Sequence, residues 1–362
     1  MIEKPIVAVL KTRPETVIDD YKRLMQMAGL EKALDRSSPV ILKNNISWHL
    51  FYPAANTTPW QLEAVIQYLF DLGFHDVSVV QNETVVTNAF IGEKLNRYTG
   101  LYQKYGVKVL YNFRESDMRW ETYTPKADML ALNRIFPSGI KVPGYFFGKN
   151  IVHLPTMKCH IYTEMTGAMK NAFGGLLDRR RHYCHSRIHE VLTDLLAIQK
   201  EIHTGIFAVV DGTTAGDGPG PRTMRPVVKN YILAGADQVA VDAVSARMLG
   251  FDPLEQIKCI RLAHEEGLGC GDFAAIDVRG EQIDNVNFGF KSGDNMASRA
   301  GDLFWFGPLA YLQRLVFHTP IVYAFIMASA LYHDRFWYPI IGKRTVKAWL
   351  TGTEWGKLFQ TY

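Results

Sequence analysis

Short apolar runs alternate with helix-length segments along most of this chain. The runs lie at 6–10, 40–42, 77–80, 107–111, 151–155 and 206–210, and helical spacing of apolar residues fills most of the intervals between them. Parallel strands need a crossover of a dozen or more residues, which is usually a helix. The pattern therefore predicts an α/β fold, with a mainly parallel sheet and helices on both faces.

Residues 112–148 interrupt this alternation. They hold acids, arginines and the prolines Pro125, Pro137 and Pro143, which helix interiors and central strands accept poorly. We expect an irregular excursion or a small cap over the sheet. The prediction is one α/β domain over 1–300, or two lobes with a boundary near 112–150, followed by an apolar, aromatic C-terminal segment over 301–362.

The C-terminal segment contains a run without charged side chains. Residues 315–333 include no Asp, Glu, Lys or Arg, and a membrane-spanning helix needs about 20 apolar residues. The flanking side chains resemble an interfacial belt: Trp305, Phe306, Arg314, Arg335, Trp337 and Tyr338. Three interpretations stay open: an arm on the core or in a homodimer interface, attachment of 303–340 to a membrane surface, and a spanning helix.

Charge and cysteine content exclude several classes of protein. The net charge is +4 and the tight basic cluster is limited to 179–181, so no nucleic-acid partner is expected. The four cysteines form no CxxC pair, which is typical of a reducing compartment and argues against an iron–sulfur cluster held by this chain alone. The apolar run at 6–10 is too short for a signal peptide, so we expect a cytoplasmic protein.

The stretch 151–185 concentrates reactive side chains. It contains Lys158, Cys159, His160, Lys170, Asn171, Asp178, three consecutive arginines, His182, Cys184 and His185. An apolar run opens it, and the small-residue sequence TGAMK reads as a helix start. Strand, loop and helix in this order are a common setting for a site in α/β proteins.

Lys170 and His160 are the central pair of this stretch. Lys170, with Asn171 beside it at a helix start, suits an anionic substrate group, or a nucleophile or base. The alternative is an ordinary surface lysine. His160 suits a general acid, a general base or a metal ligand, against a hydrogen-bonded loop histidine. His182, His185 and His189 share one face if helical, as a metal-binding stripe or as a solvated or substrate-facing one.

Two aspartates occur in apolar surroundings. Asp211 ends a strand, and we expect it in the site, orienting a base or a metal. Asp242 lies within the helical sequence QVAVDAVSA, where structural pairing is the better interpretation. After Asp211 we expect a glycine-rich loop, GTTAGDGPGP, which is not a dinucleotide fingerprint. Asn44 and Thr57 are expected at the same sheet edge.

The motifs LPTMKCH, TGAMKNAFGG, VVDGTTAGDGPGP and ADQVAVDAVSARMLGFDP occur in this order. Together with ILKNN and the helix TTPWQLEAVIQYLFDLGF, they resemble the family known as domain of unknown function 362, over roughly residues 38–280. The resemblance assigns no general reaction. Many members carry ferredoxin-type cysteine clusters, and this chain has none.

A weaker resemblance is to the nickel-pincer lactate racemase superfamily. His160, Lys170 and His185 have the spacing of its histidine, its cofactor-bearing lysine and its second ligand histidine. The resemblance implies a covalent cofactor on Lys170. This chain departs from the pattern in having TGAMK in place of a double-glycine turn.

These observations predict an enzyme for a redox or proton-transfer step on an anionic, large or lipophilic organic molecule, with an unidentified metal or organic cofactor. The expected catalytic residues are Lys170, His160 and Asp211, the substrate-binding residues are Lys158, Asn171, Asn44 and Thr57, and the metal ligands are His182 and His185. The alternative is a non-catalytic carrier of a cofactor or lipid-like ligand that docks at a membrane surface.

Overall fold

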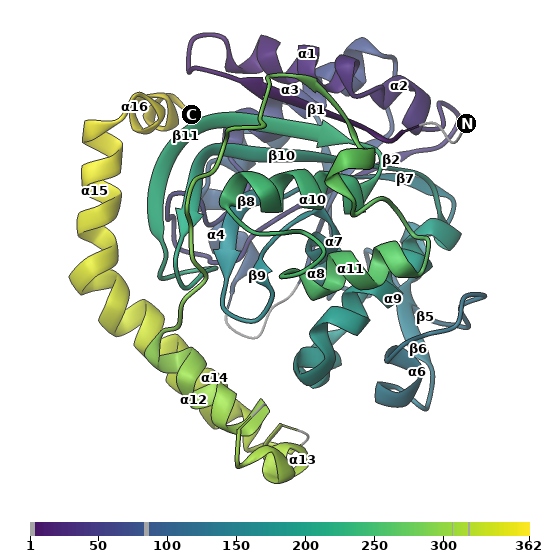
Figure 1. The fold of residues 1–362 in the computed structure, drawn as a ribbon, viewed down its shortest axis with the longest axis vertical. Helices are drawn as coiled ribbons and strands as arrows, with labels where there is room; N and C mark the ends of the chain where they lie inside the picture. Colours follow the sequence, from purple (N-terminus) through teal and green to yellow (C-terminus); the bar gives the residue numbers. More distant parts are fainter. Residues whose placement is uncertain (1–3, 83–86, 306, 318) are drawn as a thin grey trace.

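A large, mostly parallel sheet forms the centre of the molecule (Figure 1). The computed structural model describes residues 4–82, 87–305, 307–317 and 319–362. The strand order is β12-β1-β11-β10-β7-β2-β3-β4. Its strands are β1 (Ile6–Lys11), β2 (Val40–Asn44), β3 (Val77–Gln81), β4 (Lys108–Tyr111), β7 (Lys149–Leu154), β10 (His203–Asp217), β11 (Arg225–Gly235) and β12 (Asp277–Gly280). Neighbours are parallel except on the two sides of β11, so the predicted fold class is confirmed.

Helices cover both faces of the sheet because the strands are apolar on both sides. Along β2, Ile41 packs into one core, and Val40 and Leu42 pack into the other. The first core includes α9 (Ile188–Ile202), α10 (Gln238–Leu249) and α11 (Lys258–Glu265). The second includes α1 (Val17–Met27), α2 (Leu30–Ala33), α3 (Pro59–Asp71) and α5 (Tyr98–Tyr105), with α4 (Ala89–Leu95) preceding α5. Helix α3 begins after Thr58, whose side chain accepts from the Gln61 amide, with Pro59 as the first helical residue.

The prediction of a glycine-rich loop immediately after Asp211 is wrong. Strand β10 continues to Asp217, because β11 pairs with its second half from Thr214↔Val228 to Asp217↔Arg225. The chain after Pro155 likewise continues as β8 (Thr156–His160), which lies beside β10 and forms a hairpin with β9 (Glu164–Met165). A Cβ on Gly216 would come within 2.8 Å of the Lys158 Cβ, so this glycine permits the close approach of β8.

The excursion at 112–148 is a small antiparallel ribbon beside the sheet. It contains β5 (Trp120–Tyr123) and β6 (Ile140–Pro143), with the short helix α6 (Leu132–Ile135) between them and a 3-10 turn, Gly144–Phe146, after them. The carboxylate of Asp194 in α9 accepts from the amides of Leu130, Ala131 and Leu132 at 2.7–2.9 Å. This excursion is therefore fastened to the first core.

The C-terminal segment forms an arm along one side of the molecule and then returns to the sheet (Figure 1). Its helices are α12 (Met296–Trp305), α13 (Gln313–Phe317), α14 (Val322–Ala330), a π-helix (Leu331–Gly342), α15 (Lys343–Gly352) and α16 (Glu354–Thr361). Trp349, Trp355 and Phe359 are buried in the second core. Within the described ranges, no helix is both long and apolar enough to cross a membrane. Phe306 and His318 lie outside those ranges.

Candidate functional site

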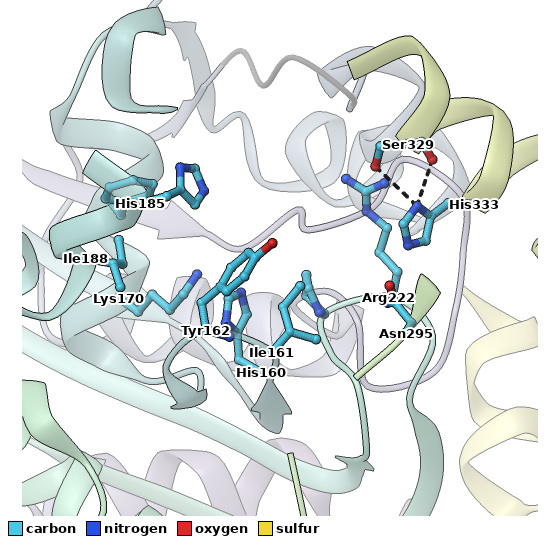
Figure 2. Close-up of a pocket in the computed structure, with 12 residues that line it drawn as sticks. His160, Ile161, Tyr162, Lys170, His185, Ile188, Arg222, Asn295, Ser329 and His333 are labelled. Atoms are coloured by element: carbon cyan, nitrogen blue, oxygen red, sulfur yellow. Dashed lines mark hydrogen bonds between the residues drawn. The ribbon is translucent and has the colours of Figure 1, made fainter. Parts of the chain in front are cut away.

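Two adjoining cavities lie where the parallel strands end. Their volumes are about 280 and 240 Å³, and both are lined by Lys170, Phe173, His185, Pro221 and Arg222. Lys43, Asn82 and Pro155 line the second cavity, and each lies at or just beyond the carboxyl end of its strand, β2, β3 and β7. Ligands of open α/β sheets bind at this edge. We refer to the two cavities together as the cleft, with the first cavity being the one drawn in Figure 2.

The short helix that carries Lys170 is held in place by a buried carboxylate on another helix. It lies in α7 (Ala168–Asn171), which precedes α8 (Phe173–Leu176). The Asp242 carboxylate in α10 accepts from the amides of Ala168 and Met169 at 2.6 and 3.0 Å. A Cβ on Gly167 would come within 2.3 Å of the Asp242 Oδ1, so only glycine allows this approach. The structural pairing expected for Asp242 is found, and it positions the helix that carries Lys170.

His160 and His185 both form a hydrogen bond through Nδ1, but this nitrogen accepts in His160 and donates in His185. Nδ1 of His160 accepts from the Tyr162 amide at 3.1 Å, so the proton of the neutral ring is on Nε2. Nδ1 of His185 donates to the carbonyl of His182 at 2.9 Å, so Nε2 of His185 carries a lone pair. Burial and the charge of Lys170 lower the pKa of His160 well below its ordinary value, and burial lowers the pKa of His185 to about 4. Both rings are therefore neutral near pH 7.

Cationic side chains converge on the cleft without a carboxylate among them. Lys43, Lys170, Arg181 and Arg222 line it, and its described lining residues include no Asp or Glu. Figure 2 shows Lys170 and His185 on one side of the first cavity, and Arg222 and His333 on the other. Nη1 of Arg222 is buried and has no hydrogen-bond partner among the described residues.

Burial weakens the cationic forms of these groups. It lowers the pKa of Lys43 to about 7, with a further contribution from the nearby Arg181. Burial likewise lowers the pKa of Lys170 to about 8 and that of Arg222 to about 10, although Asp334 partly opposes the change at Arg222. An anion in the cleft would favour the charged forms of these groups.

The structure gathers four of the predicted residues in the cleft. His160, Lys170 and His185 line the first cavity, and Asn171 lines the second, where its side-chain amide also donates to the Lys43 carbonyl at 2.7 Å. Residues that sequence reasoning did not assign are Lys43, Arg181, Arg222 and His333. A signal existed for Lys43, which ends the apolar strand β2, whereas Arg222 and His333 reach the cleft only through the fold.

The remaining predicted residues lie outside both cavity linings. Lys158 is fully buried behind them, where Nζ donates to the Ala55 carbonyl at 2.6 Å and to Thr156 Oγ1 at 2.7 Å. Thr57 and Asn44 are also buried: Thr57 donates to the Leu154 carbonyl, and the Asn44 amide donates to the Tyr102 hydroxyl. His182 lies on the 3-10 segment Arg179–Arg187, with Nδ1 directed to the Arg179 carbonyl at 2.9 Å.

Asp211 does not face the cleft as expected. Its Oδ2 accepts from Tyr21, Thr58 and Trp60 at 2.7–2.9 Å, and its Oδ1 accepts from the amide and hydroxyl of Thr213 at 3.0 and 2.8 Å. Asp211 lies within β10 and not at its end, and its side chain turns into the second core, where it accepts from Tyr21 of α1 and from Thr58 and Trp60 at the start of α3. In the structure this carboxylate ties helices to the sheet.

The histidine stripe is not assembled as a metal site in the part of the chain that is described. No group of three or more His, Cys, Asp or Glu side chains there has an arrangement that would hold a metal ion. The imidazoles of His182 and His185 each bond through Nδ1 to a carbonyl three residues earlier.

The fold and the cleft define a class: an α/β protein with a mostly parallel sheet and a cationic cleft at the carboxyl edge of its strands. Within that class, the chain belongs to the family described as "Domain of unknown function (DUF362)", whose profile matches residues 40–247. This range includes Lys43, His160, Lys170, His185 and Arg222. No curated protein and no solved structure matches the chain. The resemblance to the lactate racemase superfamily receives no support from these comparisons.

Proposed function

We propose that this protein is an enzyme that binds an anionic organic substrate in the cleft and moves a proton on it, with Lys170, His160 and His185 around the reacting atoms. The observation that carries the proposal is the convergence of Lys43, Lys170, Arg181 and Arg222 on a cleft whose described lining holds no carboxylate. Desolvation of the Lys43 and Lys170 ammonium groups destabilises their charged forms, and an anionic ligand in the cleft would offset that cost.

The hydrogen bonds of the two imidazoles give them different roles, one as a base and the other as a donor. His185 has a free lone pair on Nε2 and acts as the base, taking a proton from a carbon next to a carboxylate or carbonyl group. The electrons of that C–H bond move onto the oxygen. The Nε2–H of neutral His160 and the ammonium group of Lys170 stabilise the oxyanion. The imidazolium of His185 then returns a proton to the enolate, so the net reaction is exchange of that proton or isomerisation of the substrate.

Binding is tested first, by titration calorimetry with a panel of small 2-hydroxy, 2-oxo and phosphorylated acids. We expect Lys170→Met and Arg222→Met to lower affinity for the best ligand by roughly 10- to 100-fold each, since a hydrogen bond to a charged group contributes about 1.5–3 kcal/mol. Lys32→Met, a change of the same charge at an exposed position of α2, is the matched control. Equal affinity in all three variants would refute the cationic cleft as the binding site.

Chemistry is tested by exchange of the ligand's C–H protons in deuterium oxide, followed by NMR. His185→Gln should slow exchange by about 10²- to 10⁴-fold with affinity retained, because only the base is lost. His160→Gln keeps an N–H donor and should retain more activity than His160→Leu. Binding without exchange for any acid in the panel would favour the carrier alternative.

The racemase resemblance leads to a separate proposal, a covalent cofactor on Lys170. The first cavity brings His160, Lys170 and His185 together, as that resemblance requires, and Lys170 Nζ has no hydrogen bond among the described contacts. Intact-mass measurement of the natively produced protein, with peptide mapping, decides it. An adduct on Lys170 would replace the electrostatic role assigned above to its ammonium group.

A further inference from the structure

The arm of the molecule is a continuous run of helix. Helix α14, the π-helix and α15 follow one another without a break from Val322 to Gly352. One side of this run, which we call the arm helix, packs against the body: Trp48 contacts the rings of Trp337 and Tyr338, and the Tyr338 hydroxyl donates to the Phe51 carbonyl at 2.9 Å. The arm helix therefore has a fixed orientation, with its other side turned outward.

The outward side is apolar over its first two thirds. Tyr323 and Met327 are 65% and 61% exposed, and Leu331, Phe336, Ile340 and Ile341 are also exposed. A π-helix closes its turns with i→i+5 hydrogen bonds and so holds more residues per turn than an α-helix. Outward positions therefore recur at four or five residues, from Leu331 to Phe336 to Ile340, and the exposed apolar stripe stays in line. The neighbouring segment adds exposed Leu303, Tyr311, Leu315 and Ile321.

The charge on this surface has a single sign. Arg335, Lys343, Arg344 and Lys347 are exposed, the last three just beyond the apolar stripe. Asp334 is the one acid in the sequence between 303 and 353. Its carboxylate points to the body, accepting from Trp48 Nε1 at 2.6 Å and lying 3.6 Å from His49 Nε2.

We propose that the arm helix docks flat on an anionic phospholipid surface, with the apolar stripe inserted at the headgroup boundary and the basic side chains on the lipid phosphates. An apolar face bordered by Lys and Arg is the pattern of interfacial helices, and each basic residue adds attraction to anionic lipid. A second copy of this chain fits less well, because a self-complementary interface needs acids opposite these basic groups and the face exposes none.

The same helix forms part of the candidate site. Ser329 and His333 project from the arm helix into the first cavity, and His333 Nδ1 donates to the Ser329 carbonyl at 2.8 Å (Figure 2). The arm helix would therefore separate the membrane surface from the first cavity. Docking uses only the outward side of the arm helix, so this proposal does not depend on the reaction proposed above.

The test is cosedimentation of the full chain with vesicles of phosphatidylcholine alone, or mixed with phosphatidylglycerol. We expect binding to the mixed vesicles, weakened by added salt, and little to phosphatidylcholine. Lys343→Ala, Arg344→Ala and Lys347→Ala combined should weaken binding on the order of 100-fold, at about fivefold per charge. Lys32→Ala, Arg36→Ala and Lys108→Ala combined, also exposed but off the arm, change net charge equally and should bind as wild type.

A second variant isolates the apolar stripe. Met327→Asp with Leu331→Asp replaces exposed side chains, so the fold and unfolding temperature should persist while vesicle binding is lost. Wild-type binding by this variant, or no preference for phosphatidylglycerol, overturns the proposal. So does a concentration-dependent dimer in light scattering that this variant converts to monomer, because the stripe would then be an interface between two copies.

Discussion

At the scale of single residues, burial of the Lys43 ammonium in the cleft lowers the stability of the ligand-free protein. Lys43 is only 2% exposed and its ammonium donates to the Asn44 carbonyl, with Arg181 close enough to lower its pKa. A Cβ on Gly175 would come within 2.7 Å of the Lys43 Cε, so the chain is also shaped to admit this side chain. A desolvated charge that lowers folding stability is characteristic of functional sites.

Lys43→Met should stabilise the ligand-free protein near pH 7. The folded pKa of about 7 lies below the value near 10.4 of an unfolded chain, so between these pH values the unfolded state binds a proton that the folded state does not. Wild-type stability therefore rises with pH across this window, and the variant lacks that contribution. Urea unfolding at pH 7 and 9 should show a difference of a few kcal/mol at pH 7 that shrinks at pH 9. An unchanged difference would contradict the assignment.

Asp211→Asn tests whether that carboxylate belongs to the site or to the core. The NH2 of Asn is a donor and would face some of the O–H and N–H donors that now bond to the carboxylate. We therefore expect the free energy of unfolding, measured in urea, to fall by about 2–4 kcal/mol. Ligand affinity in the fraction that remains folded should match wild type. A large loss of affinity with stability retained would instead support the catalytic role expected from the sequence.

At the scale of elements, the short helix α7 depends on α10. Asp242→Ala removes the acceptor for the amides of Ala168 and Met169 and should cost about 1–2 kcal/mol, as for loss of a helix cap. Affinity for anionic ligands should also fall, because Lys170 loses its fixed position. Asp237→Ala is the matched control, because the Asp237 carboxylate caps α10 by accepting from the amides of Val239 and Ala240 and also accepts from the amide of Cys270. It should cost similar stability with affinity unchanged, measured by calorimetry.

Asp242 also predicts a dependence of stability on pH. Burial raises its pKa to about 7, above the unfolded value near 3.9. A raised folded pKa stabilises the protein at low pH, and this contribution is lost as pH rises towards about 7. Asp242→Asn should therefore flatten the part of the stability profile between about pH 4 and 7. If the stability of the variant and of wild type changed with pH in parallel, the pKa of the Asp242 carboxyl would be the same in the folded and unfolded states.

At the scale of the whole molecule, the chain end closes the second core. The Trp355 ring lies 5.2 Å from that of Trp60, and its Nε1 donates to Asn230 Oδ1 at 2.7 Å. Because Trp60 also donates to Asp211, the C-terminal helix is part of the same buried network. The terminal part of the segment 301–362 is thus an arm on the core, and its middle part is exposed.

Trp355→Ala should cost about 3–5 kcal/mol, the usual loss for a large buried aromatic side chain. Tyr323→Ala, on the exposed stripe, should change stability by less than about 0.5 kcal/mol. Chemical denaturation followed by circular dichroism measures both. Wild-type stability of the Trp355 variant would mean that the C-terminal helix does not belong to the folding unit.

Local patterns in the sequence were sufficient for much of the architecture and part of the site. Strands appear where apolar runs were seen, because both faces of a covered parallel sheet must be apolar. TGAMK was read as a helix start, and Lys170 does lie in a helix, α7, although it is only four residues long. The second half of β10 was missed since its glycines read as a loop until β11 is beside it. Asp211 was assigned to the site because the apolar run 206–210 was taken to end there, whereas β10 continues to Asp217 and the side chain points into the second core.

The amino-acid sequence by itself therefore determined the α/β class and the family, and it indicated His160 and Lys170, which line one cavity, since these depend on periodicity, motif order and spacing along one stretch. Only the tertiary structure decided which charges meet. Lys43, Arg181, Arg222 and His333 come from segments far apart in the chain, and their convergence depends on how sheet, helices and arm pack. The tautomers of His160 and His185 were likewise set by backbone groups that folding places beside their rings.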